Sequence, residues 1–146
     1  MKSLFTSLED SKSITVLGGA NAGQRSIYNA IRPIRTPDDL KGLKIRVQQS
    51  DSQVRMLQLL GGIPSPMSFG EVYSALQTGV LDGAENNEPS YNAMKHDEVA
   101  KYYSYTRHLM IPDFLLMSTQ TLDKMDETDR DALLAIIPDI TQKASD

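Results

Sequence analysis

Arg46 is the residue whose type and setting point most directly to chemistry. It lies in the segment KIRVQ (44–48), where the alternation of Ile45 and Val47 predicts a strand with Arg46 on its other face. A guanidinium presents a planar fork of N–H donors that matches a carboxylate bidentately, and this contact is strong in a partly closed cleft. An arginine at a strand edge that faces water fits the same pattern. Arg46 therefore indicates an anion site but does not require one.

A pair of amides, Asn86 and Asn87, follows Glu85 where a second short strand is expected to end. An amide both donates and accepts hydrogen bonds, which suits a ligand with carboxylate and hydroxyl groups. Ordinary turn chemistry explains the same residues, because Asn, Asp and Gly occupy turns for local reasons. From the residues alone, both interpretations stay open.

Catalytic chemistry has little support in the sequence. There are two histidines and no cysteine, and no serine lies in a G-x-S-x-G pattern. His96 falls in the charged run KHDE and is expected at the surface. His108 follows an extended segment and can face a pocket, or it can be a structural histidine with satisfied hydrogen bonds. We therefore predict a protein that is not an enzyme, with a small hydrolase or isomerase using His108 and Glu85 as the rival.

No cofactor or metal is expected. The acidic residues include no EF-hand spacing and no paired histidine–glutamate motif. The glycine pairs 18–19 and 61–62 fit no phosphate-binding loop. Without cysteine, a thiolate metal site and a disulfide are both impossible.

Composition narrows the class of protein. The chain has 146 residues, of which 40% are hydrophobic, so it is long enough to bury a core as one domain or as the larger part of a two-lobed protein. A net charge of −4 argues against a nucleic-acid partner, since such domains usually present a basic face. The first ten residues, MKSLFTSLED, lack the apolar stretch of a signal peptide.

Short strands and helices are expected to alternate along the chain. Thr36 and Pro37 followed by two aspartates predict a helix start, and Ser50 predicts another. We expect strands at 14–17, 25–29, 44–48, 64–68 and 81–86, a flexible turn at 18–23, one longer helix along 91–102, extended segments at 104–111 and 114–118, and helices at 3–9, 119–125 and 128–142. Pro138 should kink or end the last helix. This order predicts an α/β sandwich with a mainly parallel sheet.

Three predicted strand ends collect polar or aromatic residues, at 46–50, 66–69 and 85–89. Ligands of open α/β sheets bind beyond the carboxyl ends of the strands. The sequence thus predicts an acidic α/β unit with a cleft that contains an arginine.

A family resemblance rests on two long segments. RPIRTPDDLKGLKIRVQQS (32–50) and GGIPSPMSFGEVYSALQTGVLDGAENN (61–87) resemble the signature region of the DctP-type extracytoplasmic solute-binding proteins of TRAP transporters. The similarity continues over 88–125 and covers nearly the whole chain. It implies one three-layer α/β sandwich lobe of a two-lobed clamshell, like that of periplasmic binding proteins.

The resemblance also implies a set of ligand-binding residues. The arginine of the K-[IL]-R-V strand, here Arg46, would pair with the ligand carboxylate. The asparagine that closes D-G-x-E-N would contact the same carboxylate, and the aromatic residue of P-x-P-M-x-F would line the pocket. The implied set is Arg46, Asn86, Arg25, Phe69, Gln49, Asn87 and His108.

The resemblance implies a chain that begins partway through the first lobe. Residues 1–23 would be a remnant of the first lobe and crossover, 24–110 the second lobe, and 111–146 the return to the first lobe. The ligand would be a sugar acid such as a hexuronate, or a C4-dicarboxylate, and the partners would be TRAP membrane subunits in a periplasmic setting. Self-association through exposed first-lobe segments is a further expectation. A ligand-sensing module or an inactive truncated fragment are the alternatives.

Overall fold

The computed structural model describes residues 2–145, with side chains from residue 5 onward. It contains two compact units. The larger is Gln24–Met110, and the smaller combines Met1–Gly23 with Ile111–Asp146.

The larger unit is built on a five-stranded sheet with the order β3-β2-β4-β1-β5. The strands are β1 (Ile14–Asn29), β2 (Lys44–Val47), β3 (Ile63–Pro66), β4 (Gly83–Asn86) and β5 (Tyr102–Ser118). β2 is parallel to both β3 and β4, while β1 is antiparallel to β4. The central strands are short and buried on both faces, as expected for a sheet that is covered on both sides.

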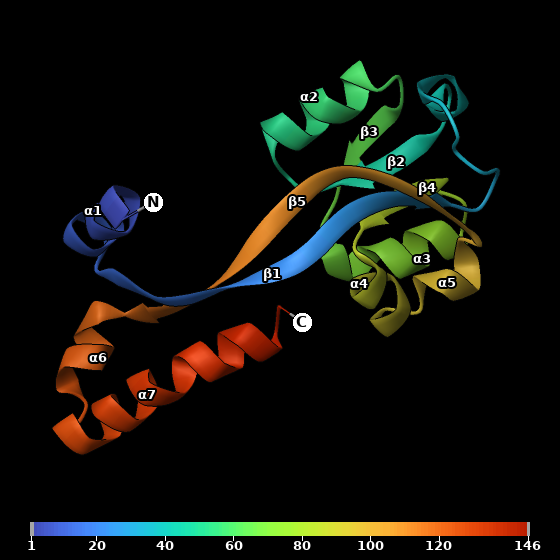
Figure 1. The fold of residues 1–146 in the computed structure, drawn as a ribbon. Coiled ribbons are helices and arrows are strands. Elements are labelled where there is room, and N and C mark those ends of the chain that lie inside the picture. The colour runs from blue at the N-terminus through green and yellow to red at the C-terminus, as the bar shows by residue number, and fades with distance from the viewer. Residues whose placement is uncertain (1, 146) are drawn as a thin grey trace. The chain divides into compact units, whose positions relative to one another are not determined.

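Helices cover both faces of this sheet (Figure 1). On one face, η1 (Pro37–Leu40) and α2 (Asp51–Leu59) enclose an apolar cluster that includes Ile27, Ile45, Val47 and Leu57. On the other, η2 (Phe69–Glu71), α3 (Val72–Gln77), α4 (Glu88–Ala93) and α5 (His96–Val99) enclose a second cluster around Tyr28, Val72, Leu76 and Ala84. The predicted three-layer α/β lobe is confirmed.

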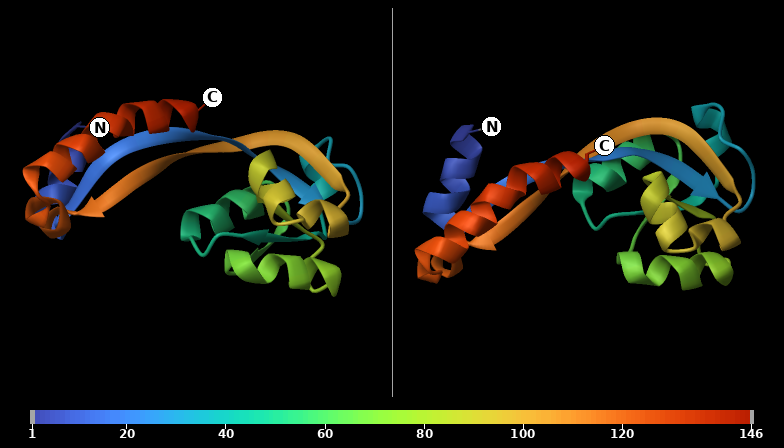
Figure 2. Two further views of the ribbon diagram at one scale, coloured as in Figure 1. Left: turned by 90° about the horizontal axis from the view of Figure 1, so that it is seen from below. Right: turned by 60° about the horizontal axis from the view of Figure 1, so that its bottom comes forward.

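The smaller unit contains α1 (Lys2–Lys12), α6 (Thr119–Lys124) and α7 (Glu127–Lys143), together with the outer parts of β1 and β5. α7 runs alongside β1 within this unit (Figure 2). A Cβ atom at Gly18 would lie 2.7 Å from Cγ2 of Thr141 and 2.8 Å from Cγ2 of Ile137. The predicted turn at 18–23 is therefore wrong: the strand continues, and Gly18 serves the close approach of α7.

Three other predictions of local structure need correction. The long helix predicted along 91–102 is two short helices, because Lys95 adopts a left-handed conformation with φ of 56°. The two extended segments near the C-terminus form one strand, β5. Pro112 is tolerated there because β5 lies at the end of the strand order. Of the two effects expected of Pro138, a kink or an end of the helix, the end is wrong, because α7 runs on to Lys143.

Within residues 2–145, no helix combines the length and the apolar composition that a bilayer crossing requires.

Candidate functional site

One edge of the sheet gathers the candidate residues of the larger unit. The carboxyl ends of β2, β3 and β4 meet there because these strands are parallel. β1 is antiparallel to β4 and enters the unit at the same edge, where Ser26 lies opposite Asn86. Segments that are distant in the sequence therefore place Arg25, Arg46 and Asn86 at neighbouring strand ends.

Arg46 is a buried cation with unused donors. It is 4% exposed and pairs with Ala84 across the sheet, so its side chain shares a face with those of Ala84 and Asn86. Its Nε donates to the carbonyl oxygen of Met67 at 2.9 Å, and its Cζ lies 5.6 Å from the centre of the Phe69 ring. No group within residues 5–145 accepts a hydrogen bond from its two terminal nitrogens.

The charge of Arg46 is therefore available to an anion. Burial lowers the pKa of this guanidinium, while the negative charge of Glu85 raises it. A buried charge is costly without a counterion and hydrogen-bond partners. A carboxylate that accepts from the terminal nitrogens would supply both.

Arg25 is held by Glu85. Nε of Arg25 lies 2.6 Å from Oε2 of Glu85, and Nη2 donates to Oε1 at 2.7 Å and to the backbone oxygen of Glu85 at 2.9 Å. Burial raises the pKa of Glu85, but the contacts with Arg25 and His108 outweigh it and the pKa is lowered. Glu85 is therefore ionised at neutral pH.

Asn86 has a fixed amide. Its Oδ1 accepts from Nη1 of Arg25 and from the backbone N–H of Asn87, each at 2.9 Å. Both neighbours are donors, so the amide oxygen must face them and Nδ2 must point the other way. No acceptor for Nδ2 exists among the described side chains and backbone, which leaves this donor for a ligand on the face shared with Arg46.

The other predicted residues take more varied positions. Phe69 is half-buried beneath the Arg46 guanidinium. Asn87 caps α4, where its side chain accepts from the backbone N–H of Ser90 at 3.0 Å. Gln49 is exposed just after β2. His108 contacts the hydroxyl of Thr106 through Nδ1, at 2.8 Å.

His96 corrects one prediction. It was expected at the surface, yet it is fully buried, because α5 turns this residue toward the sheet. Its Nδ1 lies 2.7 Å from the hydroxyl of Tyr28, and its ring meets Phe69 edge-on at 5.7 Å. Burial lowers the pKa of His96, and Arg46 nearby lowers it further. His96 thus supports the Phe69 wall from behind as a neutral imidazole.

Sequence reasoning assigned no ligand-site role to Glu85, Met67 or Tyr28. One signal for Glu85 exists in retrospect: an acid in the buried strand GAEN needs a basic partner. The carbonyl of Met67 and the hydroxyl of Tyr28 have no comparable sequence signal, since their roles depend on tertiary contacts.

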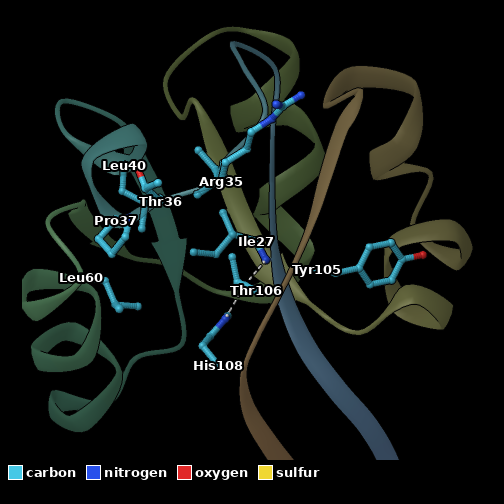
Figure 3. A pocket seen from close by; sticks show the side chains of 10 residues that line it. Ile27, Arg35, Thr36, Pro37, Leu40, Leu60, Tyr105, Thr106 and His108 are labelled. Carbon is cyan, nitrogen blue, oxygen red and sulfur yellow. Dashed lines mark hydrogen bonds between the residues drawn. The ribbon is translucent and has the colours of Figure 1, made fainter.

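A cavity of about 330 Å³ opens on the α2 face (Figure 3). His108 and Thr106 lie on one side of it, and Leu60, Pro37 and Leu40 lie on the other. Of the seven predicted ligand residues, His108 alone lines it. The cavity is thus distinct from the strand-end cluster of Arg46 and Asn86.

Within residues 2–145, no three histidine or acidic side chains are arranged to hold a metal ion.

Comparison with known proteins gives a consistent result. The family model described as bacterial extracellular solute-binding protein, family 7 (DctP), matches residues 1–146. A curated relative, a solute-binding protein of Chromohalobacter salexigens, is 48% identical over 122 residues, which is 84% of this chain and 36% of the relative.

Solved structures agree with the sequence relatives. A TRAP periplasmic solute-binding protein from Chromohalobacter salexigens with bound D-glucuronate superimposes with a TM-score of 0.92 at 42% identity, over 99% of this chain and 48% of that one. A second, from Sulfitobacter with bound β-D-galacturonate, has a TM-score of 0.90 at 45% identity, over 97% and 47% of the two chains. The chain thus spans less than half the length of these proteins.

Proposed function

Because the chain belongs to family 7 of the bacterial extracellular solute-binding proteins, we propose that it contributes the carboxylate-binding lobe of a receptor for sugar acids. Receptors of this kind serve TRAP-type transporters, so the partners would be TRAP membrane subunits in the periplasm. The family and its solved members are substrate-binding proteins rather than enzymes.

The observation that supports this proposal best is the pairing of unused donors at the strand ends. Arg46 presents two terminal nitrogens, and Asn86 presents Nδ2 on the same face of the sheet. A carboxylate has two oxygens with several lone pairs and can accept from both residues at once. Phe69 would form an apolar wall beside it, and Gln49 would contact the ligand from the exposed end of β2.

Hexuronates are the ligand class that the solved neighbours favour. Two neighbours above 40% identity hold glucuronate or galacturonate. Asn87, which caps α4, would lie at the outer part of the site, whereas His108 lines the cavity on the α2 face and would reach the site only through Glu85. Arg25 would position the amide of Asn86 rather than bind the ligand through a pair of free guanidinium N–H donors.

An enzymatic role for His108 and Glu85 has no support in the geometry. Glu85 is ionised, buried and held by Arg25, so it is a weak base with no free lone pair directed at solvent. Nε2 of His108 lies 3.5 Å from Oε2 of Glu85, which is long for a hydrogen bond.

In a whole receptor, residues 24–110 would form the second lobe, and residues 1–23 with 111–146 would belong to the crossover and first lobe. Ligand capture would end in hinge closure of the two lobes. Because this chain spans less than half the length of its relatives, we expect it to bind weakly on its own, with a Kd of about 1 mM or above.

The test is a titration of ¹⁵N-labelled chain with D-glucuronate, followed through the Nε–Hε signals of the arginines. We expect the Arg46 signal to shift and Arg46→Ala to weaken binding at least roughly tenfold. Arg55→Ala is the matched control, because Arg55 is an exposed arginine on α2. Arg46→Lys should recover part of the affinity, since it keeps the charge but loses the fork.

Two outcomes would count against the proposal. Binding that is unchanged in Arg46→Ala would remove this residue from the site. A submicromolar affinity for a uronate would show that the single lobe needs no partner lobe.

A further inference from the structure

Two buried arginines lie at the sheet edge where the carboxyl ends of β2, β3 and β4 meet. Their presence at first suggests a site for two carboxylates. Arg25 is 8% exposed and Arg46 is 4% exposed. The two side chains start on opposite faces of the sheet, but Arg25 reaches Asn86, which lies on the Arg46 face. A dicarboxylate could in principle pair with both guanidinium groups.

Glu85 occupies most of the hydrogen-bond donors of one of the two arginines, Arg25. Of the five N–H groups of an arginine, Arg25 commits four: Nε to Oε2 of Glu85, Nη2 to Oε1 and to the backbone oxygen of Glu85, and Nη1 to Asn86. A single N–H of Nη1 is left. Arg46, by contrast, commits only Nε, to Met67.

The charge count gives the same result. Among residues 5–145, the buried side chains of the Arg, Lys, Asp and Glu types are Arg25, Arg46 and Glu85. Two cations and one anion leave one net positive charge, and the unused donors place it at Arg46. The exposed Glu88 beyond β4 adds a negative charge.

We propose that Glu85 is a specificity-determining residue that holds Arg25 away from the ligand, so that the unit of residues 24–110 offers ligand carboxylates the guanidinium of Arg46 and not that of Arg25. This rests on the proposed function, because it assumes that Arg46 binds the first carboxylate. A second carboxylate near Arg25 would meet the negative charge of Glu85 and find no free buried counterion among residues 5–145. Within this unit, a diacid therefore gains nothing from its second charge.

The test compares two open-chain acids that differ at one end. D-Gluconate has one carboxylate, and D-glucarate has the same hydroxyl groups and a carboxylate at both ends. Each is titrated into ¹⁵N-labelled chain at about pH 8, where imidazoles are neutral. For the wild type, we expect similar affinities within about threefold and a shift of the Arg46 Nε–Hε signal, while the Arg25 signal moves no further with D-glucarate than with D-gluconate.

Three variants make the test specific. Glu85→Gln should raise the preference for D-glucarate by roughly tenfold, because Arg25 regains its free charge. Arg25→Gln/Glu85→Gln removes both charges and should return the preference to the wild-type value. Glu127→Gln, which changes the net charge equally at an exposed site on α7, should leave the preference unchanged.

The possible outcomes distinguish a failure of the proposed function from a failure of the role proposed for Glu85. If neither acid shifts Arg46, both the proposed function and the role of Glu85 are wrong. If both acids shift Arg46 but Glu85→Gln leaves the ratio of their affinities unchanged, or if the wild-type Arg25 signal moves further with D-glucarate than with D-gluconate, only the role of Glu85 is overturned. Should Glu85→Gln unfold, the wild-type Arg25 signal still decides.

Discussion

At the scale of single residues, the Arg25–Glu85 pair makes stability depend on pH. The pKa of Glu85 is lowered in the folded protein even though burial alone would raise it. Such a group stabilises the fold at pH values above its unfolded pKa, about 4.3 for glutamate, and this contribution is lost as the pH falls through the lowered, folded value.

We therefore expect Glu85→Gln to cost about 3 kcal/mol at neutral pH, because Arg25 would be left as an unpaired buried cation. The difference from wild type should begin to narrow below the unfolded pKa of about 4.3 and should be lost as the pH falls through the lowered pKa of Glu85 in the folded protein. Urea unfolding of both proteins at pH 7 and pH 3 measures this, with Glu127→Gln as the exposed control. An equal difference at both pH values would contradict the ionic role of the pair.

The fixed amide of Asn86 gives a second prediction. Asn86→Asp keeps the size of the side chain but replaces the Nδ2 donor with a carboxylate oxygen beside the ligand. We expect D-glucuronate binding to weaken at least roughly tenfold through the lost hydrogen bond and the added repulsion. Asn92→Asp, at an exposed position of α4, adds the same charge and should bind as wild type does. Equal losses in both variants would indicate a general charge effect.

At the scale of the elements, the sheet depends on Gly83 at the start of β4. A Cβ atom there would lie 2.3 Å from the backbone oxygen of Tyr28 and 2.6 Å from Cβ of Asn29. Because β4 is bordered by β1 and β2, neither neighbour can move aside without disturbing the sheet. Gly83→Ala should therefore destabilise the larger unit by about 3 kcal/mol.

Thermal unfolding provides the measurement, and Gly70→Ala provides the control. A Cβ atom at Gly70 would meet nothing within 4 Å, so this variant should stay within about 0.5 kcal/mol of wild type. If the two variants unfolded at the same temperature, the close approach at Gly83 would not matter for stability.

Elements with local signals could be predicted from the sequence. Thr36 and Pro37 begin η1 as expected, and KIRV forms the expected strand with Arg46 opposite its apolar face. The gathering of Arg46 and Asn86 at one sheet edge was predictable too, because it follows from the order of strands and helices.

The features that the sequence did not show depend on contacts between distant segments. The strand at Gly18 continues because α7, more than a hundred residues later, packs against it. The Arg25–Glu85 pair joins β1 to β4, and the burial of His96 depends on Tyr28 of β1. No local pattern encodes such pairings, although the GAEN strand signals that Glu85 needs a partner.

At the scale of the whole molecule, the smaller unit exposes much of its apolar surface. Phe114, Leu115 and Ile140 are 42%, 44% and 48% exposed and line one cavity of about 260 Å³. Contiguous exposed apolar surface of this kind commonly marks an interaction site. We propose that a second copy of the chain covers it when the chain is alone in solution.

Light scattering should therefore show a mass that rises with protein concentration. Leu115→Lys/Ile140→Lys should shift the protein toward monomer, because burying two ammonium groups would oppose association. Leu59→Lys, at a 70% exposed position of α2, is the control and should associate as wild type does. A wild-type chain that stays monomeric over the whole concentration range would contradict this expectation.

For the proposed receptor, the locked orientation of the Asn86 amide bears on which chemical form of a sugar acid would bind. With Oδ1 committed to Arg25, every group that Asn86 and Arg46 leave open is a hydrogen-bond donor. A uronic acid in water exchanges with its neutral lactone, and esters of it occur as well. The lactone and the esters lack the negative charge that would pair with Arg46. The corresponding amide would place its own N–H donors next to the N–H donors of Asn86 and Arg46. A receptor that binds only the ionised acid would remove this form from its equilibrium with the lactone. By mass action, more lactone would then hydrolyse to the acid.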